Sequence, residues 1–255
     1  MSYQPRLPMA LGSSRQFEPV SYIAEGAKNY AESKGLSYSP KGLENTRVDP
    51  VRGWSVGQEL QKNMKDSPTP ETLNSYEALR KETVDQYNHM TKPVHEGGMG
   101  VRVEVTDDDP YGDPKDLAAD LRNRQIKVLS TKSTGPHGYF TDEENDMFRA
   151  VHDVFGHAGI GRDFGRHGEE AAYQSHRQMF SPAAHDALVS ETRGQNSYLN
   201  YISHGDHFPD NVPVNMPKWT QSTGKFRGIP EERAQARERK RGNKEMSGEQ
   251  LKFDI

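Results

Sequence analysis

The sequence of 255 residues contains no cysteine. This absence excludes disulfide bonds, thiolate metal ligands and a cysteine nucleophile. Apolar residues are also scarce, at 32% of the chain with a mean hydropathy of −0.98, which is low for a fully globular protein. We therefore expect a modest hydrophobic core with long polar extensions.

Long apolar runs and an excess of positive charge are missing as well. No stretch approaches the ~20 apolar residues that span a bilayer, and residues 1–19 lack the apolar run of a signal peptide. We expect no membrane association. The formal net charge of −4 provides no global basic field, so nucleic acid is not an expected partner.

Composition divides the chain into three parts. Residues 1–45 form a polar N-terminal arm with a short helix, because helical spacing of apolar residues is confined there to Val20–Ala31. Residues 46–228 form a helical core domain, and residues 229–255 form a charged tail of interleaved glutamates and arginines. The arms either pack on the core domain or contact a partner chain, such as a second copy or a virion component.

Helical periodicity dominates the core domain, with two exceptions. Val101–Val105 and Gln125–Ser130 alternate apolar and polar residues, as half-buried strands do. A helix that starts at Asp113–Pro114 separates them, so the order strand, helix, strand allows a small sheet. The predicted fold class is mainly α with a small β element (α+β), a helical core around a metal site, and extended polar arms at both ends.

Histidine is concentrated in one region, since eight of the ten histidines lie between His137 and His207. The residues before the central segment His152–His157 predict a helix. Thr141 is a suitable N-cap, and Glu144 stands three residues later, as in a capping box. Apolar residues then follow at helical spacing and place His152 at the edge of the core face.

The spacing of His152 and His157 limits how they can share a metal ion. Residues five apart in a continuous α-helix point about 140° apart, whereas residues four apart are separated by about 40°. The two imidazoles can meet only if the helix ends or distorts between them. Gly156 permits this, so we predict one ligand on the last helical turn and one just beyond it.

A third ligand is expected from the helices that follow. The helix after Pro182 places Glu191 and Gln195 on its apolar stripe, and buried carboxylates are rare unless paired or bound to metal. Glu191 is the first choice, although an ion pair with a nearby arginine also explains it. Glu169 and His176 on the preceding helix are reserves, better suited to orienting the ligands.

The His-Asp-x-x-Gly-His segment and the glutamate in Val189–Thr192 together resemble the iron site of the pterin-dependent aromatic amino acid hydroxylases. The resemblance covers about residues 140–201. It implies that His152, His157 and Glu191 bind a non-haem iron as a facial triad of two histidines and one carboxylate. The whole chain also resembles small proteins of actinobacterial phages and prophages, which implies no activity.

The sequence departs from the hydroxylase pattern at several points. Asp153 stands where the family has glutamate, and Ala158–Gly159 replaces a turn that contains proline. The gap to Glu191 is short, and no segment matches the family's pterin-binding region.

Three functions follow from these residues. Two imidazoles and one carboxylate leave coordination positions open, which favours Fe(II) and a mononuclear non-haem iron oxygenase or hydroxylase-like protein. The residues expected to orient the ligands or line the pocket are Asp153, Glu169, His176 and Gln195. The second hypothesis is a zinc-dependent hydrolase with the same ligands and Asp153 or Glu169 as general base. The third is a phage virion or assembly protein with a structural or vestigial metal.

The sequence also predicts the kind of partner and the location of the protein. The glycine-rich loop 158–168 contains Arg162 and Arg166, which favours a small anionic substrate. The absence of a signal peptide and the likeness to phage proteins place the protein in the cytoplasm of a host cell or in a virion.

Overall fold

The computed structural model describes residues 16–64, 68–203, 216 and 218–221. Most of this part of the chain is helical. The α-helices are α1 Ser21–Ser33, α2 Pro50–Asn63, α3 Pro70–Thr91, α4 Pro114–Arg122, α5 Thr131–Thr134, α6 Asp142–Val151, α7 Arg166–His176, α8 His185–Val189 and α9 Gln195–Tyr201. Two π-helical segments, η3 His152–Ala158 and η6 Ser190–Gly194, continue α6 and α8. Short 3-10 turns are η1 Leu43–Asn45, η2 Val94–Glu96, η4 Arg177–Met179, η5 Pro182–Ala184 and η7 Lys218–Gln221.

The two predicted strands form one parallel sheet. Strand β1, Arg102–Thr106, pairs along its whole length with β2, Gln125–Leu129. The connection runs through α4, as a parallel pair requires. On β2, Ile126 and Val128 are buried while their neighbours are more exposed, which matches the alternation in the sequence. The prediction of a mainly α fold with a small β element is confirmed.

Side-chain caps explain where several helices begin. Asp49, Thr69 and Asp113 accept backbone N–H bonds at the starts of α2, α3 and α4, each followed by proline at the first helical position. The capping box predicted at the start of α6 is present. Thr141 accepts from the Glu144 amide, and the Glu144 carboxylate accepts from the Thr141 amide.

One core cluster joins the N-terminal helix to the sheet. Ile23 and Ala27 of α1 are fully buried in it with Leu117 of α4, Ile126 of β2 and Phe155 of η3. Of the two roles open for the helix of the polar arm, packing on the core domain is the one found. Residues 1–15 and the tail 229–255 lie outside the described residues.

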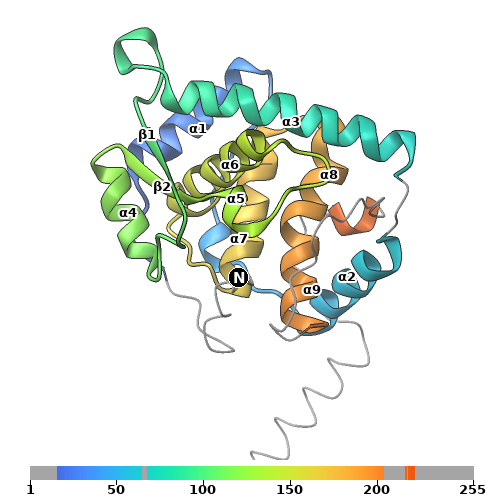
Figure 1. The fold of residues 1–255 in the computed structure, drawn as a ribbon. Coiled ribbons are helices and arrows are strands. Elements are labelled where there is room, and N and C mark those ends of the chain that lie inside the picture. The colour runs from blue at the N-terminus through green and yellow to red at the C-terminus, as the bar shows by residue number, and fades with distance from the viewer. Residues whose placement is uncertain (1–15, 65–67, 204–215, 217, 222–255) are drawn as a thin grey trace, which may run out of the picture.

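A second core cluster lies beneath α3 and joins it to α2, α6, α7 and α8. Figure 1 shows α3 running across one side of the molecule, with the sheet and α4 near one end and α2 near the other. Segments α6, η3 and α7 contribute to both clusters or pack beside them, and η3 and α7 carry His152, His157, His167 and His176. Among the described residues, no helix combines the length and apolar character needed to cross a membrane.

Candidate metal centre

The π-helical segment η3 brings His152 and His157 to the same side of the chain. In a π-helix each hydrogen bond closes over five residues, so residues five apart stack on successive turns. The two ring centroids are 5.2 Å apart and the ring planes are nearly perpendicular, at 87°. The predicted distortion between the histidines is present, but the helix widens through Gly156 instead of ending there.

Helix α7 lies close against η3 and supplies a carboxylate. A Cβ atom on Gly156 would be 3.2 Å from the Ala172 Cβ and 3.3 Å from the Ala172 carbonyl oxygen, so glycine permits this close approach. Glu169 lies about one turn before Ala172 on α7. Its Oε2 is 3.6 Å from His152 Nε2 and 3.5 Å from His157 Nε2. One ligand atom from each of the three residues lies within 4.8 Å of the others, so the group could hold a metal ion.

The electrostatic setting keeps the Glu169 carboxyl ionised. Burial alone raises the pKa of a carboxyl group, but the neighbouring His157 and His152 outweigh it and lower the pKa of Glu169. The site is not closed, because the side chains of Glu169 and His152 are 24% and 13% exposed. His157 is 1% exposed. Glu169 and His152 therefore form the side of the group that faces outward.

The loop that follows holds the Nδ1 nitrogen of the buried His157. Its Nδ1 lies 3.2 Å from the carbonyl oxygen of Arg162. A carbonyl can only accept, so Nδ1 carries a proton, and in the neutral ring Nε2 is the nitrogen that can bind a metal ion. The N-terminal segment fixes this loop, since the Phe17 amide donates to the Gly161 carbonyl at 3.0 Å. Gly161 has a φ of +67°, a conformation that favours glycine.

His152 has a different outer contact. Its Nδ1 lies 3.3 Å from Nδ1 of His176, which is fully buried in α7. Burial and the two neighbouring histidines lower the pKa of His176 well below its usual range. His176 was predicted to orient a ligand, and it contacts His152 without belonging to the three-residue group.

Glu191 lies in a separate polar cluster. Its carboxylate accepts from the Tyr76 hydroxyl and from the Gln195 amide at 2.7 Å, and its Oε2 is 3.2 Å from His137 Nε2. His137 Nδ1 accepts the amide protons of Tyr139 and of the next residue, so Nε2 carries the ring proton. Burial would raise the pKa of Glu191, but His137, Tyr76 and Gln195 together lower it.

The surroundings of the two carboxylates decide which one fits a metal site. Donors point at Glu191, so its charge is already satisfied within the fold. Imidazole nitrogens point at Glu169, and a metal ion satisfies such a group. The structure therefore puts Glu169, the reserve residue, beside the two histidines in place of the predicted Glu191. Gln195, which was expected to orient a ligand or line the pocket, donates to the Glu191 carboxylate.

Asp153 is not one of the three residues whose ligand atoms converge, and its charge acts on Tyr111. Burial raises the pKa of the Tyr111 phenol, and the charges of Asp120 and Asp153 raise it further. This places Asp153 toward α4 and the sheet. The arginines of the glycine-rich loop are also engaged within the fold. Arg162 is fully buried and donates to the Thr46 carbonyl, and the Arg166 guanidinium lies 5.9 Å from the centre of the Tyr201 ring.

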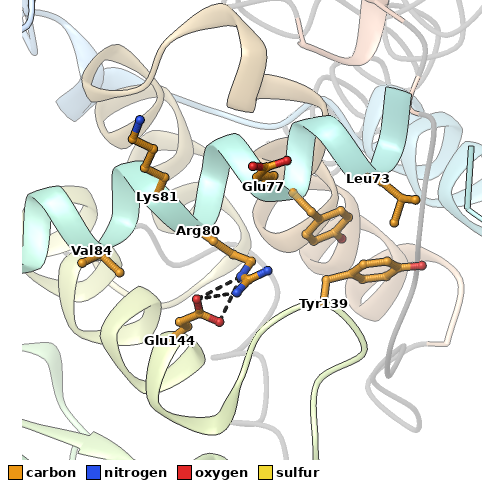
Figure 2. A pocket seen from close by; sticks show the side chains of 8 residues that line it. Leu73, Glu77, Arg80, Lys81, Val84, Tyr139 and Glu144 are labelled. Carbon is orange, nitrogen blue, oxygen red and sulfur yellow. Dashed lines mark hydrogen bonds and ion pairs between the residues drawn. The ribbon is translucent and has the colours of Figure 1, made fainter. Parts of the chain in front are cut away.

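A surface pocket of about 420 Å³ opens on the outer side of α3. Figure 2 shows Arg80 of α3 and Glu144 of α6 pointing toward each other at its edge, where Arg80 Nη2 and Glu144 Oε1 are 2.7 Å apart. Tyr139 stacks on Tyr76 at 4.2 Å between centroids, and both rings line the pocket. The Tyr76 hydroxyl reaches Glu191, so the pocket adjoins the Glu191 cluster; none of the three metal-site residues lines it.

Gln86 is a residue of the site that sequence reasoning missed. It is fully buried on α3, and its Oε1 is 2.8 Å from His176 Nε2. The signal was available, because Gln86 lies seven residues after Leu79 and three after Thr83, on the inner stripe of α3. An amide on such a stripe needs a buried partner.

Neither a protein-family model, a curated protein nor a solved structure matches this chain. The likeness to the aromatic amino acid hydroxylases therefore depends on the motif residues alone.

Proposed function

We propose that the protein is a mononuclear non-haem iron oxygenase or hydroxylase-like protein that binds Fe(II) through His152, His157 and Glu169. The observation that carries the proposal is the convergence of two imidazole Nε2 atoms and one carboxylate oxygen at a partly exposed position. Two histidines and one carboxylate with open positions are the ligand set typical of Fe(II) oxygenases. The metal, when bound, supplies activation of O₂ for oxidation of a substrate held beside it.

The protein residues hold the ligands and exclude water on the inner side. The Phe148 ring stacks near His152 at 6.1 Å between centroids, and the Phe164 ring packs against His157 at 4.8 Å. These rings form an apolar wall behind the imidazoles. Because Glu169 and His152 remain partly exposed, the substrate approaches from their side, and the reaction is directed away from the core.

A zinc hydrolase with the same three ligands is the competing proposal. It needs a general base beside the metal-bound water. The two residues expected to serve are not placed for this, because Glu169 belongs to the metal group and Asp153 lies toward Tyr111. This disfavours hydrolysis relative to oxygenation.

Metal analysis of protein purified without chelator tests the proposal. We expect one Fe(II) per chain after anaerobic loading, and loss of that binding in His157→Ala and Glu169→Gln. Glu191→Gln is the matched control, because it makes the same chemical change in the neighbouring cluster and should bind iron as the wild type does. Binding that survives Glu169→Gln and disappears in Glu191→Gln would restore the sequence-based ligand set.

The open coordination position is tested separately. Nitric oxide added anaerobically to the Fe(II)-loaded protein should give the electron paramagnetic resonance signal of an iron–nitrosyl adduct. Stoichiometric zinc in the purified protein, with no such signal after iron loading, would favour the hydrolase. Failure to bind any divalent metal at micromolar concentration would refute both and leave a histidine-rich structural protein.

A further inference from the structure

A chain of buried polar groups connects α3 to the metal group. Gln86 Nε2 donates to the Met179 carbonyl at 3.2 Å, and Gln86 Oε1 lies 2.8 Å from His176 Nε2. His176 Nδ1 in turn lies 3.3 Å from Nδ1 of His152. Gln86 and His176 are fully buried. The chain therefore reaches His152 from a helix that contributes no metal ligand.

The position of each proton in this chain follows from chemistry. The Met179 carbonyl can only accept, so the Gln86 amide nitrogen faces it and the amide oxygen faces His176. That oxygen accepts, so the proton of the buried, neutral His176 is on Nε2 and its Nδ1 has a lone pair. The contact between Nδ1 of His176 and Nδ1 of His152 then requires a proton on Nδ1 of His152. In the neutral ring, Nε2 of His152, which faces Glu169, is then the nitrogen that can bind a metal ion.

We propose that Gln86 is a positioning residue that fixes, through His176, the tautomer in which His152 binds the metal ion. The inference rests on the proposed metal site and extends it to a helix 66 positions upstream of the ligand in the chain. The Arg162 carbonyl has the same effect on His157, because it also holds the proton on Nδ1. Both imidazoles are therefore oriented to bind through Nε2. Outer partners of metal-bound histidines orient the ring and raise its affinity for metal.

His176 is not itself the ligand in this arrangement. One of its nitrogens is occupied by Gln86 and the other by His152. A purely structural role for Gln86 is the alternative reading, since a buried hydrogen bond also stabilises the fold. The two readings differ in one observable, the protonated nitrogen of His152.

Long-range ¹H–¹⁵N correlation spectra of protein labelled with ¹⁵N-histidine measure this observable. We expect metal-free wild type to show His152 with its proton on Nδ1, assigned from the His152→Gln variant, and Zn(II)-loaded wild type to show Nε2 bound. Gln86→Met, of similar shape without the amide, should give a mixture of tautomers and about tenfold weaker Zn(II) binding. Thr83→Val, a buried polar change one turn earlier on α3, is the control and should match wild type.

A second pair of variants keeps the test decisive if Gln86→Met does not fold. His176→Asn places an amide oxygen near the lost Nδ1 and should retain the His152 tautomer and most of the affinity. His176→Leu offers no acceptor and should lose both. Equal loss in the two variants would make His176 a ligand and overturn the inference.

The failure of the inference and that of the metal site are distinguishable. Wild-type tautomer and affinity in Gln86→Met, with binding abolished in His157→Ala, would refute the role of Gln86 and leave the site intact. Absence of metal binding in wild type would refute the proposed function, while the metal-free spectra still test the tautomer.

Discussion

The buried pair Glu170–Arg193 offers the sharpest test of how the fold holds α7 in place. Glu170 follows Glu169 in α7, but its carboxylate pairs with Arg193 and not with the histidines. Its Oε2 accepts from Arg193 Nε at 2.8 Å, and its Oε1 pairs with Arg193 Nη2. Both side chains are at most 2% exposed. The pair therefore joins α7 to the π-helical segment η6 inside the protein.

The structure sets the size of the expected effect. Glu170→Met leaves the Arg193 cation buried without its carboxylate, and Arg193→Met leaves the carboxylate with the Gln174 amide at 2.6 Å as its remaining donor. Each single change should cost about 3–5 kcal/mol. The double variant removes both charges and leaves the Thr220 carbonyl without the Arg193 donor, a loss of about 1–3 kcal/mol.

Urea unfolding monitored by circular dichroism measures these values, and the m-value shows whether the transition stays comparable between variants. For a chain of this size the single variants should melt about 6–20 °C below wild type. Glu32→Gln is the control, because the exposed pair Lys28–Glu32, at 3.7 Å and 58% exposed on each side, should contribute less than about 0.5 kcal/mol.

The reasoning is refuted if either single variant loses less than about 1 kcal/mol, or if the double variant loses as much as the two singles combined. The first result would mean that solvent reaches the pair. The second would mean that packing around the side chains, and not the unpaired charge, determines the cost.

Three further predictions follow from single positions. Gly156→Ala places a Cβ 3.3 Å from the His152 ring, so metal affinity measured by titration should fall several-fold, and unchanged affinity would contradict the close packing. The melting temperature should stay close to wild type, because the tight contact with Ala172 offsets a gain in helix propensity of up to about 1 kcal/mol. Burial lowers the pKa of His185 from 6.5 to about 4, so the free energy of unfolding should be highest above pH 6.5 and should fall by roughly 2–3 kcal/mol as the pH drops toward 4. In His185→Gln the free energy of unfolding should depend less on pH over that range, and a pH slope identical to that of wild type would refute the prediction. Thr141→Ala removes the acceptor for the Glu144 amide and should cost about 1 kcal/mol in urea unfolding, with no loss at all counting against the capping box.

Local chemistry made much of the fold predictable. The alternation in residues 101–105 and 125–130 was sufficient to place both strands, and the Thr141 capping box fixed the start of α6. Five-residue spacing around Gly156 required a helix distortion between His152 and His157. The form of the distortion was not predictable, because a helix end and a π-helical turn both satisfy that requirement, and packing against α7 selects between them.

The carboxylate that lies beside His152 and His157 also could not be chosen from the sequence, because the choice depends on tertiary packing. Glu169 and Glu191 both lie on inward helix faces, and spacing ranks neither. What separates them is the set of atoms that other parts of the chain direct at each carboxylate. Tyr76 is 115 positions from Glu191 in the chain, and a one-dimensional pattern does not report such contacts.

The π-helical segment η3 has a consequence for how this chain tolerates changes in length. A π-helical turn is equivalent to an α-helix that has gained one residue, and each α-helical residue turns the chain by about 100°. Deleting one position between His152 and His157 would therefore let the turn close as an ordinary α-helix, and the chain on either side would keep its facing. The deletion changes the spacing of the two histidines from five to four, so this short stretch should tolerate the loss of one residue better than the regular helix α6 does.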